Sequence, residues 1–122
     1  MKRGEIGTVS SGKDYGGNSR PAVIIQDDRF DGTDSVTICG FTRDSTDALP
    51  FRLPVEPSVT NGLSITSRIM VDKVTTVPRS KIGSRFGRLG VEDMVRLNRA
   101  VLVFLGIAEL SAAGESLTNA RC

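Results

Sequence analysis

The 122-residue chain has no histidine, no tryptophan and a single tyrosine. Without an imidazole it cannot form a Ser-His-Asp triad, a Cys-His dyad or the common kinds of zinc site. General acid or base work would therefore fall to carboxylates such as Glu5, Asp14 or Asp72, or to Tyr15, while arginines stabilise developing negative charge. Such a set of side chains suits phosphoryl transfer that needs no metal.

Long apolar runs are also missing. No segment approaches the roughly 20 apolar residues of a membrane helix, and the start MKRGEIGTVS lacks the apolar stretch of a signal peptide. The net charge is only +2, so bulk charge does not predict a nucleic-acid partner. Cys39 lies in an apolar run and Cys122 is the last residue, and we expect both thiols to be reduced. We therefore expect a cytoplasmic protein with no membrane partner.

The length predicts one domain, which we place at residues 1–110, followed by a flexible tail over residues 111–122. The first two thirds of the chain contain short apolar or β-branched runs separated by turn residues, which predicts strands at residues 5–9, 21–26, 35–41, 51–55 and 67–77. Pro54 cannot donate a ladder hydrogen bond, so its strand belongs at a sheet edge or beside a bulge. A turn is expected at Asn61-Gly62, and a bend of the last strand near Asp72.

Beyond residue 90 the apolar spacing becomes helical, which predicts one amphipathic helix whose apolar face covers the sheet. Glu92 and Asp93 lie in its first turn, where the helix dipole favours anions, and Gly106 can end it in a left-handed cap. The predicted fold class is α+β, mainly β, a small barrel-like domain with a C-terminal helix. The positions assigned to the apolar face are Val91, Met94, Val95, Val101, Leu102 and Leu105, widened by Leu97 and Phe104.

Candidate polar residues lie in a glycine-rich loop and at strand ends. The loop SSGKDYGGNSR carries Lys13, Asp14, Tyr15 and Arg20, but it lacks the spacing of a Walker loop. Its backbone amides and cations could hold the phosphates of a flexible polyanion, or it could be a plain hairpin loop. The other candidates follow or occupy later strands, and residue spacing alone does not separate a catalytic set from a solvated charge pattern. They are Thr42, Arg43, Arg68 and Asp72.

Several segments together resemble one family. These are KRGEI, SRPAVIIQDDRF, the strand ending in Phe41-Thr42, PFRLPV, SRIMVDKVTTVPRSKI and GRLGVEDMVRLNRAVLVFLG. In this order, from about Arg3 to Leu105, they resemble the MazF/PemK family of toxin endoribonucleases of type II toxin-antitoxin systems. The resemblance implies a small SH3-like twisted barrel, a homodimer, and cleavage of single-stranded RNA at short sequences with no metal or other cofactor. The implied products carry a 2′,3′-cyclic phosphate and a 5′-hydroxyl, and the implied protein partner is a cognate antitoxin.

The resemblance also implies residue roles. Arg20 and Thr42 match the core of the cleavage site, and Asp72 matches an acidic residue that takes part in proton transfer in some branches. Glu5 matches a residue that lies near bound RNA. Alternatives remain for two of these residues: Thr42 as a strand-end cap, and Asp72 as the partner of a structural salt bridge with Arg68 or Lys73. The residues expected to bind substrate are Glu5, Lys13, Asp14, Tyr15, Arg43 and Arg68.

The chain departs from the family pattern at two places that bear on catalysis. Many relatives have a glutamate five residues before the motif arginine, where this chain has Tyr15; with one extra loop residue the equivalent is Asp14. A basic residue of one branch is replaced by Met70, so the general base and acid stay open.

Two rival functions follow: a catalytically silent module that binds RNA or protein, and a gyrase poison like the CcdB toxins, whose Trp-Gly-Ile tail is absent from this chain.

Overall fold

The computed structural model describes residues 1–10, 19–44 and 51–109. Six strands form one antiparallel sheet in the order β4-β5-β3-β2-β1-β6. Within these described residues, the single-turn 3-10 helices η2 (Asp28–Phe30) and η3 (Arg79–Lys81) lie between strands, and the helix α1 (Val91–Phe104) follows the last strand. The strands are β1 (Glu5–Ser10), β2 (Ser19–Ile24), β3 (Ser35–Thr42), β4 (Arg52–Val55), β5 (Ser67–Pro78) and β6 (Ile82–Arg88).

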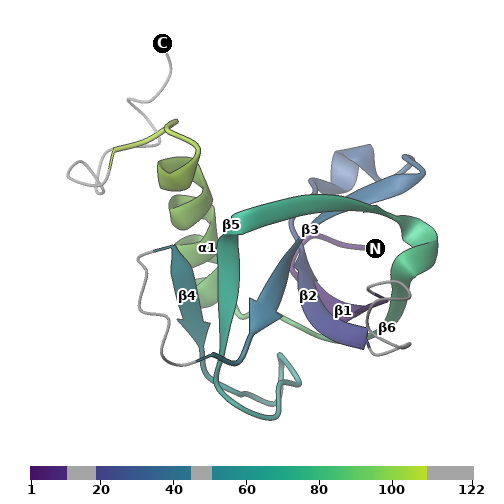
Figure 1. Ribbon diagram of the computed structural model, residues 1–122, viewed down its shortest axis with the longest axis horizontal. Helices are drawn as coiled ribbons and strands as arrows, with labels where there is room; N and C mark the ends of the chain where they lie inside the picture. Colours follow the sequence, from purple (N-terminus) through teal and green to yellow (C-terminus); the bar gives the residue numbers. More distant parts are fainter. Residues whose placement is uncertain (11–18, 45–50, 110–122) are drawn as a thin grey trace.

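The sheet curls strongly, and α1 stands beside β4 and β5 while the long arch of β5 reaches across to β6 (Figure 1). This confirms the mainly β class with a C-terminal helix and all five predicted strands. The strand containing Pro54 lies at the sheet edge as expected. The bend of β5 is also confirmed: Cys39 pairs with Val74, but Phe41, two residues further along β3, pairs with Ile69, which lies five residues before Val74.

Both faces of the sheet bury apolar side chains, which explains the uninterrupted apolar run at the end of β2, Ala22, Val23 and Ile24. Successive residues of β2 alternate, so that Val23 belongs to a cluster beneath α1, whereas Ala22 and Ile24 belong to a second cluster on the opposite face. We call them the helix-side cluster and the groove-side cluster. The first contains Ile6, Val23, Cys39, Phe41, Val55, Ile69, Val71, Leu89 and Leu97, and the second contains Val9, Ala22, Ile24, Val36 and Ile38.

The sequence did not predict β6. Its residues are mostly exposed, and two of them are glycines, so the apolar alternation that marks a strand is absent. Close packing requires those glycines: a Cβ on Gly83 would lie 2.4 Å from the hydroxyl oxygen of Thr8, and one on Gly87 would lie 2.2 Å from the backbone oxygen of Asn61. The same two glycines therefore remove the sequence pattern of a strand and allow β6 to pack beside β1 and the turn near residue 61.

The predicted face of α1 is partly wrong. Leu97 is fully buried and Met94 and Val101 pack around it, at the helical spacing of three and four residues. Val91 and Val95, in contrast, are 82% and 54% exposed. The predicted helix end is confirmed, since Gly106 follows α1 with φ +77°. The predicted tail lies outside the described residues.

Candidate active site

A groove with a volume of about 790 Å³ crosses the sheet between the ends of β2 and β3 and the outer part of β5. Its floor is apolar, because Ala22, Ile38 and Val77 belong to the groove-side cluster or pack against it. Cationic side chains line it and come from three separate elements: Arg20 of β2, Lys73 of β5 and Lys81 of η3. An apolar floor with surrounding cations suits a ligand that combines flat bases with phosphates.

Arg20 and Thr42, predicted as the core of the cleavage site, both line this groove. Arg20 is exposed near the start of β2, opposite Val9 of β1. Thr42 is half-buried at the end of β3, and its hydroxyl oxygen accepts a hydrogen bond from the Asp44 backbone amide at 3.2 Å. Because the hydroxyl only accepts in this bond, its O–H group can still donate a hydrogen bond to a phosphate. Thr42 can therefore cap the strand end and contact a phosphate at the same time.

Lys73 and Lys81 were not predicted as site residues. Beyond the bend of β5, Lys73, Thr75 and Val77 alternate along one face, and all three line the groove. That alternation was present in the sequence, but choosing the face required knowing where the bend shifts the register. Lys81 gave no sequence signal, because η3 and the strand after it were not expected.

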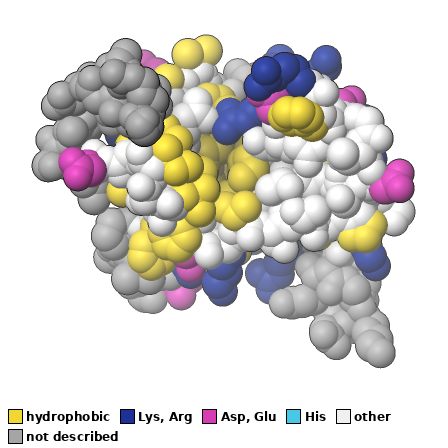
Figure 2. Space-filling view, turned by 90° about the horizontal axis from the view of Figure 1, so that it is seen from above, with side chains coloured by type: hydrophobic (Ala, Val, Ile, Leu, Met, Phe, Trp, Pro, Cys, Tyr) yellow, Lys and Arg dark blue, Asp and Glu magenta, His cyan; other side chains and the backbone are white. Residues whose placement is uncertain are grey.

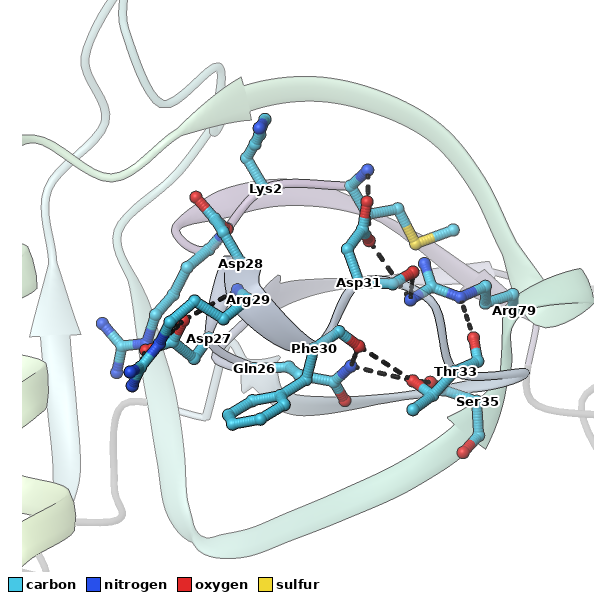
Figure 3. Close-up of polar contacts among 12 residues, drawn as sticks. Lys2, Gln26, Asp27, Asp28, Arg29, Phe30, Asp31, Thr33, Ser35 and Arg79 are labelled. Carbon is cyan, nitrogen blue, oxygen red and sulfur yellow. Dashed lines mark hydrogen bonds and ion pairs between the residues drawn. The ribbon is translucent and has the colours of Figure 1, made fainter.

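A network of polar contacts holds the turn that carries Lys81 (Figure 3). The guanidinium of Arg79 donates to the Asp31 backbone oxygen at 2.6 Å, pairs with the Asp31 carboxylate at 3.2 Å and donates to the Thr33 backbone oxygen. The Arg79 backbone amide also donates to the Asp34 backbone oxygen at 3.0 Å. These bonds tie η3 to the loop after η2 and so fix one wall of the groove.

Asp72 does not line the groove formed by the described residues. Its carboxylate forms a two-point ion pair with Arg52 of β4, with Nε to Oδ1 at 2.7 Å and Nη2 to Oδ2 at 3.0 Å. The hydrogen bonds from Arg52 hold the pKa of the Asp72 carboxyl below its usual value of 3.8, which makes it a weak base. The structural alternative expected Arg68 or Lys73 as the partner; the partner is Arg52, because β4 and β5 are neighbours.

Two other predicted substrate-binding residues differ in their relation to the groove. Arg68 pairs with Thr42 across β3 and β5, so the two side chains share one face of the sheet, but Arg68 is not among the described residues that line the groove. Glu5 begins β1, about 13 Å along the strand from Val9. Its carboxylate accepts a hydrogen bond from the Lys2 amide at 2.6 Å and pairs with Arg85 at 3.5 Å, and it is not among the described residues lining the groove.

Of the remaining predicted residues, Arg43 is exposed and lines a separate pocket of about 200 Å³. Met70, which replaces a basic residue of some relatives, lines the main groove, and a Cβ on Gly40 would lie 3.1 Å from its methyl carbon. Lys13, Asp14 and Tyr15 lie outside the described residues. No carboxylate is among the described residues that line the main groove.

Comparison with known proteins identifies the family. The sequence pattern of the PemK-like, MazF-like toxins of type II toxin-antitoxin systems matches residues 2–105. The chain is 56% identical over 108 residues to the "Probable endoribonuclease MazF" of Mycolicibacterium smegmatis, covering 88% of this chain and 99% of the relative. The chain belongs to this toxin family.

Solved structures agree on the fold. An endoribonuclease from a mycobacterial species, solved in complex with its cognate antitoxin, superposes with a TM-score of 0.73 at 20% identity, over 88% of this chain and 96% of that one. The Mycobacterium tuberculosis toxin MazF-mt6 gives a TM-score of 0.71 at 22% identity, over 84% and 96%. The curled six-stranded sheet with a C-terminal helix is thus the fold of these toxins, as the resemblance implied.

The toxin chain also carries an apolar groove of about 570 Å³ on the outer side of α1. Phe51 and Leu53, from the segment that forms β4, face Val95 and Phe104 of the helix, and the rings of Phe51 and Phe104 lie 5.4 Å apart. Further apolar surface continues at the end of the helix, where Leu105 is 56% exposed. Figure 2 shows hydrophobic side chains gathered around a hollow on the face that it draws.

Across residues 1–10, 19–44 and 51–109, no three side chains of the types His, Cys, Asp and Glu come together as a group that could hold a metal ion. Among the helices of the same residues, none has the length and apolar character needed to cross a bilayer.

Proposed function

We propose that this toxin-family endoribonuclease cuts single-stranded RNA at short sequences, without a metal ion, in the groove between β2, β3 and β5. The observation that carries the proposal is that Arg20 and Thr42, the two residues that match the family's cleavage site, line one groove with two further cations. Single-stranded RNA fits such a surface because phosphates meet the cations while unstacked bases meet apolar floor.

The proposed reaction is an internal transesterification. The ribose 2′-oxygen attacks its neighbouring phosphorus as its proton passes to a base, the bond from phosphorus to the 5′-oxygen breaks, and that oxygen takes up a proton. The products are a 2′,3′-cyclic phosphate and a 5′-hydroxyl. Arg20 stabilises the charge on the phosphate oxygens through its planar, permanently charged guanidinium, and Thr42 positions the phosphate by donating its hydroxyl proton.

The base is proposed to come from the loop before β2, as Asp14 or Tyr15. The sequence has no histidine, and the described lining of the groove has no carboxylate. For Asp72 we propose a positioning role: its ion pair with Arg52 joins β4 to the bent part of β5. Arg68, next to Thr42, and Lys13 are proposed to contact flanking phosphates.

The proposed assembly is a cytoplasmic homodimer that is silenced by a cognate antitoxin. The apolar groove beside α1 and the adjoining edge strand β4 offer the surface through which two copies would meet. Cations in the main groove suit an acidic, amphipathic antitoxin segment that folds on binding and excludes RNA. A structural neighbour that was solved with its cognate antitoxin supports the choice of this partner.

The rival function is a catalytically silent module that binds RNA. The absence of a carboxylate from the described groove lining favours it, because a silent site needs cations but no base. Incubation of the purified protein with a long defined RNA in EDTA separates the two, with cut positions read by primer extension and 5′-hydroxyl ends read by kinase labelling. We expect cuts at one short recurring sequence with ends ready for the kinase. Tight RNA binding without cuts would establish the rival.

A further inference from the structure

The small pocket that Arg43 lines lies on the opposite face of β2 and β3 from the main groove. Its volume is about 200 Å³, the space of about seven water molecules at ~30 Å³ each, which admits one planar ring system. The two cavities adjoin at the strand ends: Pro21 lines both, and Thr42 and Arg43, consecutive in the chain, line the groove and the pocket respectively. Nucleotides next to a phosphate held by Thr42 therefore lie within reach of the pocket.

Its walls combine an aromatic face with polar groups. Phe86 of β6 is 41% exposed at the pocket, which leaves part of its ring available for stacking. Arg43 supplies up to five N–H donors and no acceptor. Thr8, Ser64 and Ser67 complete the polar lining.

A turn with little freedom shapes the pocket before any ligand binds. Asn61 is 2% exposed, and its side chain accepts from the amides of Ser58 and Leu63, both at 2.9 Å, and donates to the Glu56 backbone oxygen at 2.8 Å. Gly62 follows with φ +70°, and a Cβ there would lie 2.9 Å from the Phe86 ring. Only glycine leaves space for the ring at this position, so the turn holds Phe86 in place at the pocket wall.

We propose that this pocket holds one unpaired base of the RNA next to the cleaved bond, stacked on Phe86 and read by Arg43. The inference rests on the proposed ribonuclease function. Because Arg43 only donates, its forked guanidinium favours a base with two neighbouring acceptors, which are O6 and N7 of guanine or O2 and N3 of cytosine, over adenine and uracil. The pocket therefore contributes one position of the recognition sequence, and stacking contributes affinity there.

The test is a binding panel with the recognition RNA, made non-cleavable by a 2′-deoxy sugar at the cut site and carrying an abasic site at each position in turn. For the wild type we expect one position beside the cut where loss of the base weakens binding about tenfold or more. In Phe86→Ala and Phe86→Leu, loss of that base should cost less than about twofold, with the other positions unchanged. Phe30→Ala, which removes an aromatic ring that is 57% exposed elsewhere, is the matched control and should keep the wild-type profile.

At the sensitive position, guanine or cytosine should bind more tightly than adenine or uracil, and Arg43→Ala should remove the difference. An abasic profile in both Phe86 variants identical to that of the wild type would overturn the pocket while leaving the nuclease intact. A preference for adenine or uracil there would overturn the reading by Arg43. The panel measures binding and not cleavage. If the wild type cuts no RNA, the pocket can still be tested with an RNA that the protein binds, selected from a random pool. If the wild type binds no RNA, both proposals are overturned.

Discussion

Replacement of Asp72 by asparagine distinguishes a structural carboxylate from a catalytic one. The Asp72 and Arg52 side chains are 18% and 11% exposed and share two hydrogen bonds of 2.7 and 3.0 Å. Exposed ion pairs contribute about 0–1 kcal/mol, and breaking a fully buried pair costs about 3–5 kcal/mol. At this intermediate burial we expect Asp72→Asn to lower the free energy of unfolding by about 2 kcal/mol, which for a domain of this size lowers Tm by about 6–12 °C.

The effect should depend on pH. The hydrogen bonds from Arg52 lower the pKa of the Asp72 carboxyl below its usual 3.8, so the folded state holds the charged form more strongly than the unfolded state does. The stabilisation is therefore complete above the unfolded-state pKa and is lost as the pH falls through the folded-state pKa. The difference in unfolding free energy between wild type and Asp72→Asn should be constant near neutral pH and shrink below about pH 4.

The assay is urea denaturation at one fixed protein concentration, at pH 7 and pH 3, in a double-mutant cycle with Arg52→Gln. Single-turnover RNA cleavage of Asp72→Asn, measured where the variant is fully folded, should stay within about threefold of wild type. A cleavage loss of about 100-fold in a folded variant would make Asp72 catalytic. An unchanged free energy of unfolding, or an equal loss at both pH values, would refute the role of the ion pair.

Three further predictions concern the fold. Gly62→Ala should destabilise the protein by about 1–3 kcal/mol in urea denaturation, because its Cβ requires φ +70° and meets the Phe86 ring; wild-type stability would contradict the close approach. Leu97→Ala should cost about 2–5 kcal/mol by the same measurement, since Leu97 of α1 is fully buried in the helix-side cluster, and a cost under about 1 kcal/mol would show that the helix does not seal the core there. Burial raises the pKa of the Cys39 thiol to about 11, so the thiol should react slowly in the native protein. In a Cys122→Ser background, a thiol reagent at neutral pH should label Cys39 in guanidinium but not under native conditions. Fast labelling of the native protein would mean that the thiol is accessible.

The sequence predicted those parts of the fold that depend on local patterns. Alternating β-branched residues revealed the strand over residues 67–77, Pro54 marked an edge strand, and Gly106 marked the helix end. In contrast, β6 was missed because its glycines serve close packing with distant segments, and local propensity carries no trace of such contacts.

The candidate site, like the fold, has some features that follow from local sequence and others that depend on distant contacts. Arg20 and Thr42 were found because each belongs to a recognisable motif, Arg20 near the start of β2 and Thr42 at the end of β3, and both line the groove. The contributions of Lys73 and Lys81, and the pairing of Asp72 with Arg52, depend on strand order and on the register shift at the bend of β5. Those properties arise from long-range pairing, so they could not be derived from residue spacing.

The central claim is that Arg20 stabilises the transition state of RNA cleavage in the main groove. The most direct test is the single-turnover cleavage rate of one RNA, at saturating protein and in EDTA, for wild type, Arg20→Ala, Arg20→Lys and Thr42→Ala, with Tm measured for each. Because Arg20 is exposed, all variants should fold, and Arg20→Ala should lose at least about 100-fold in rate. Arg20→Lys should give an intermediate rate, since an ammonium keeps the charge without the planar fork, and Thr42→Ala should lose less than Arg20→Ala. A folded Arg20→Ala that cleaves at the wild-type rate would contradict the account.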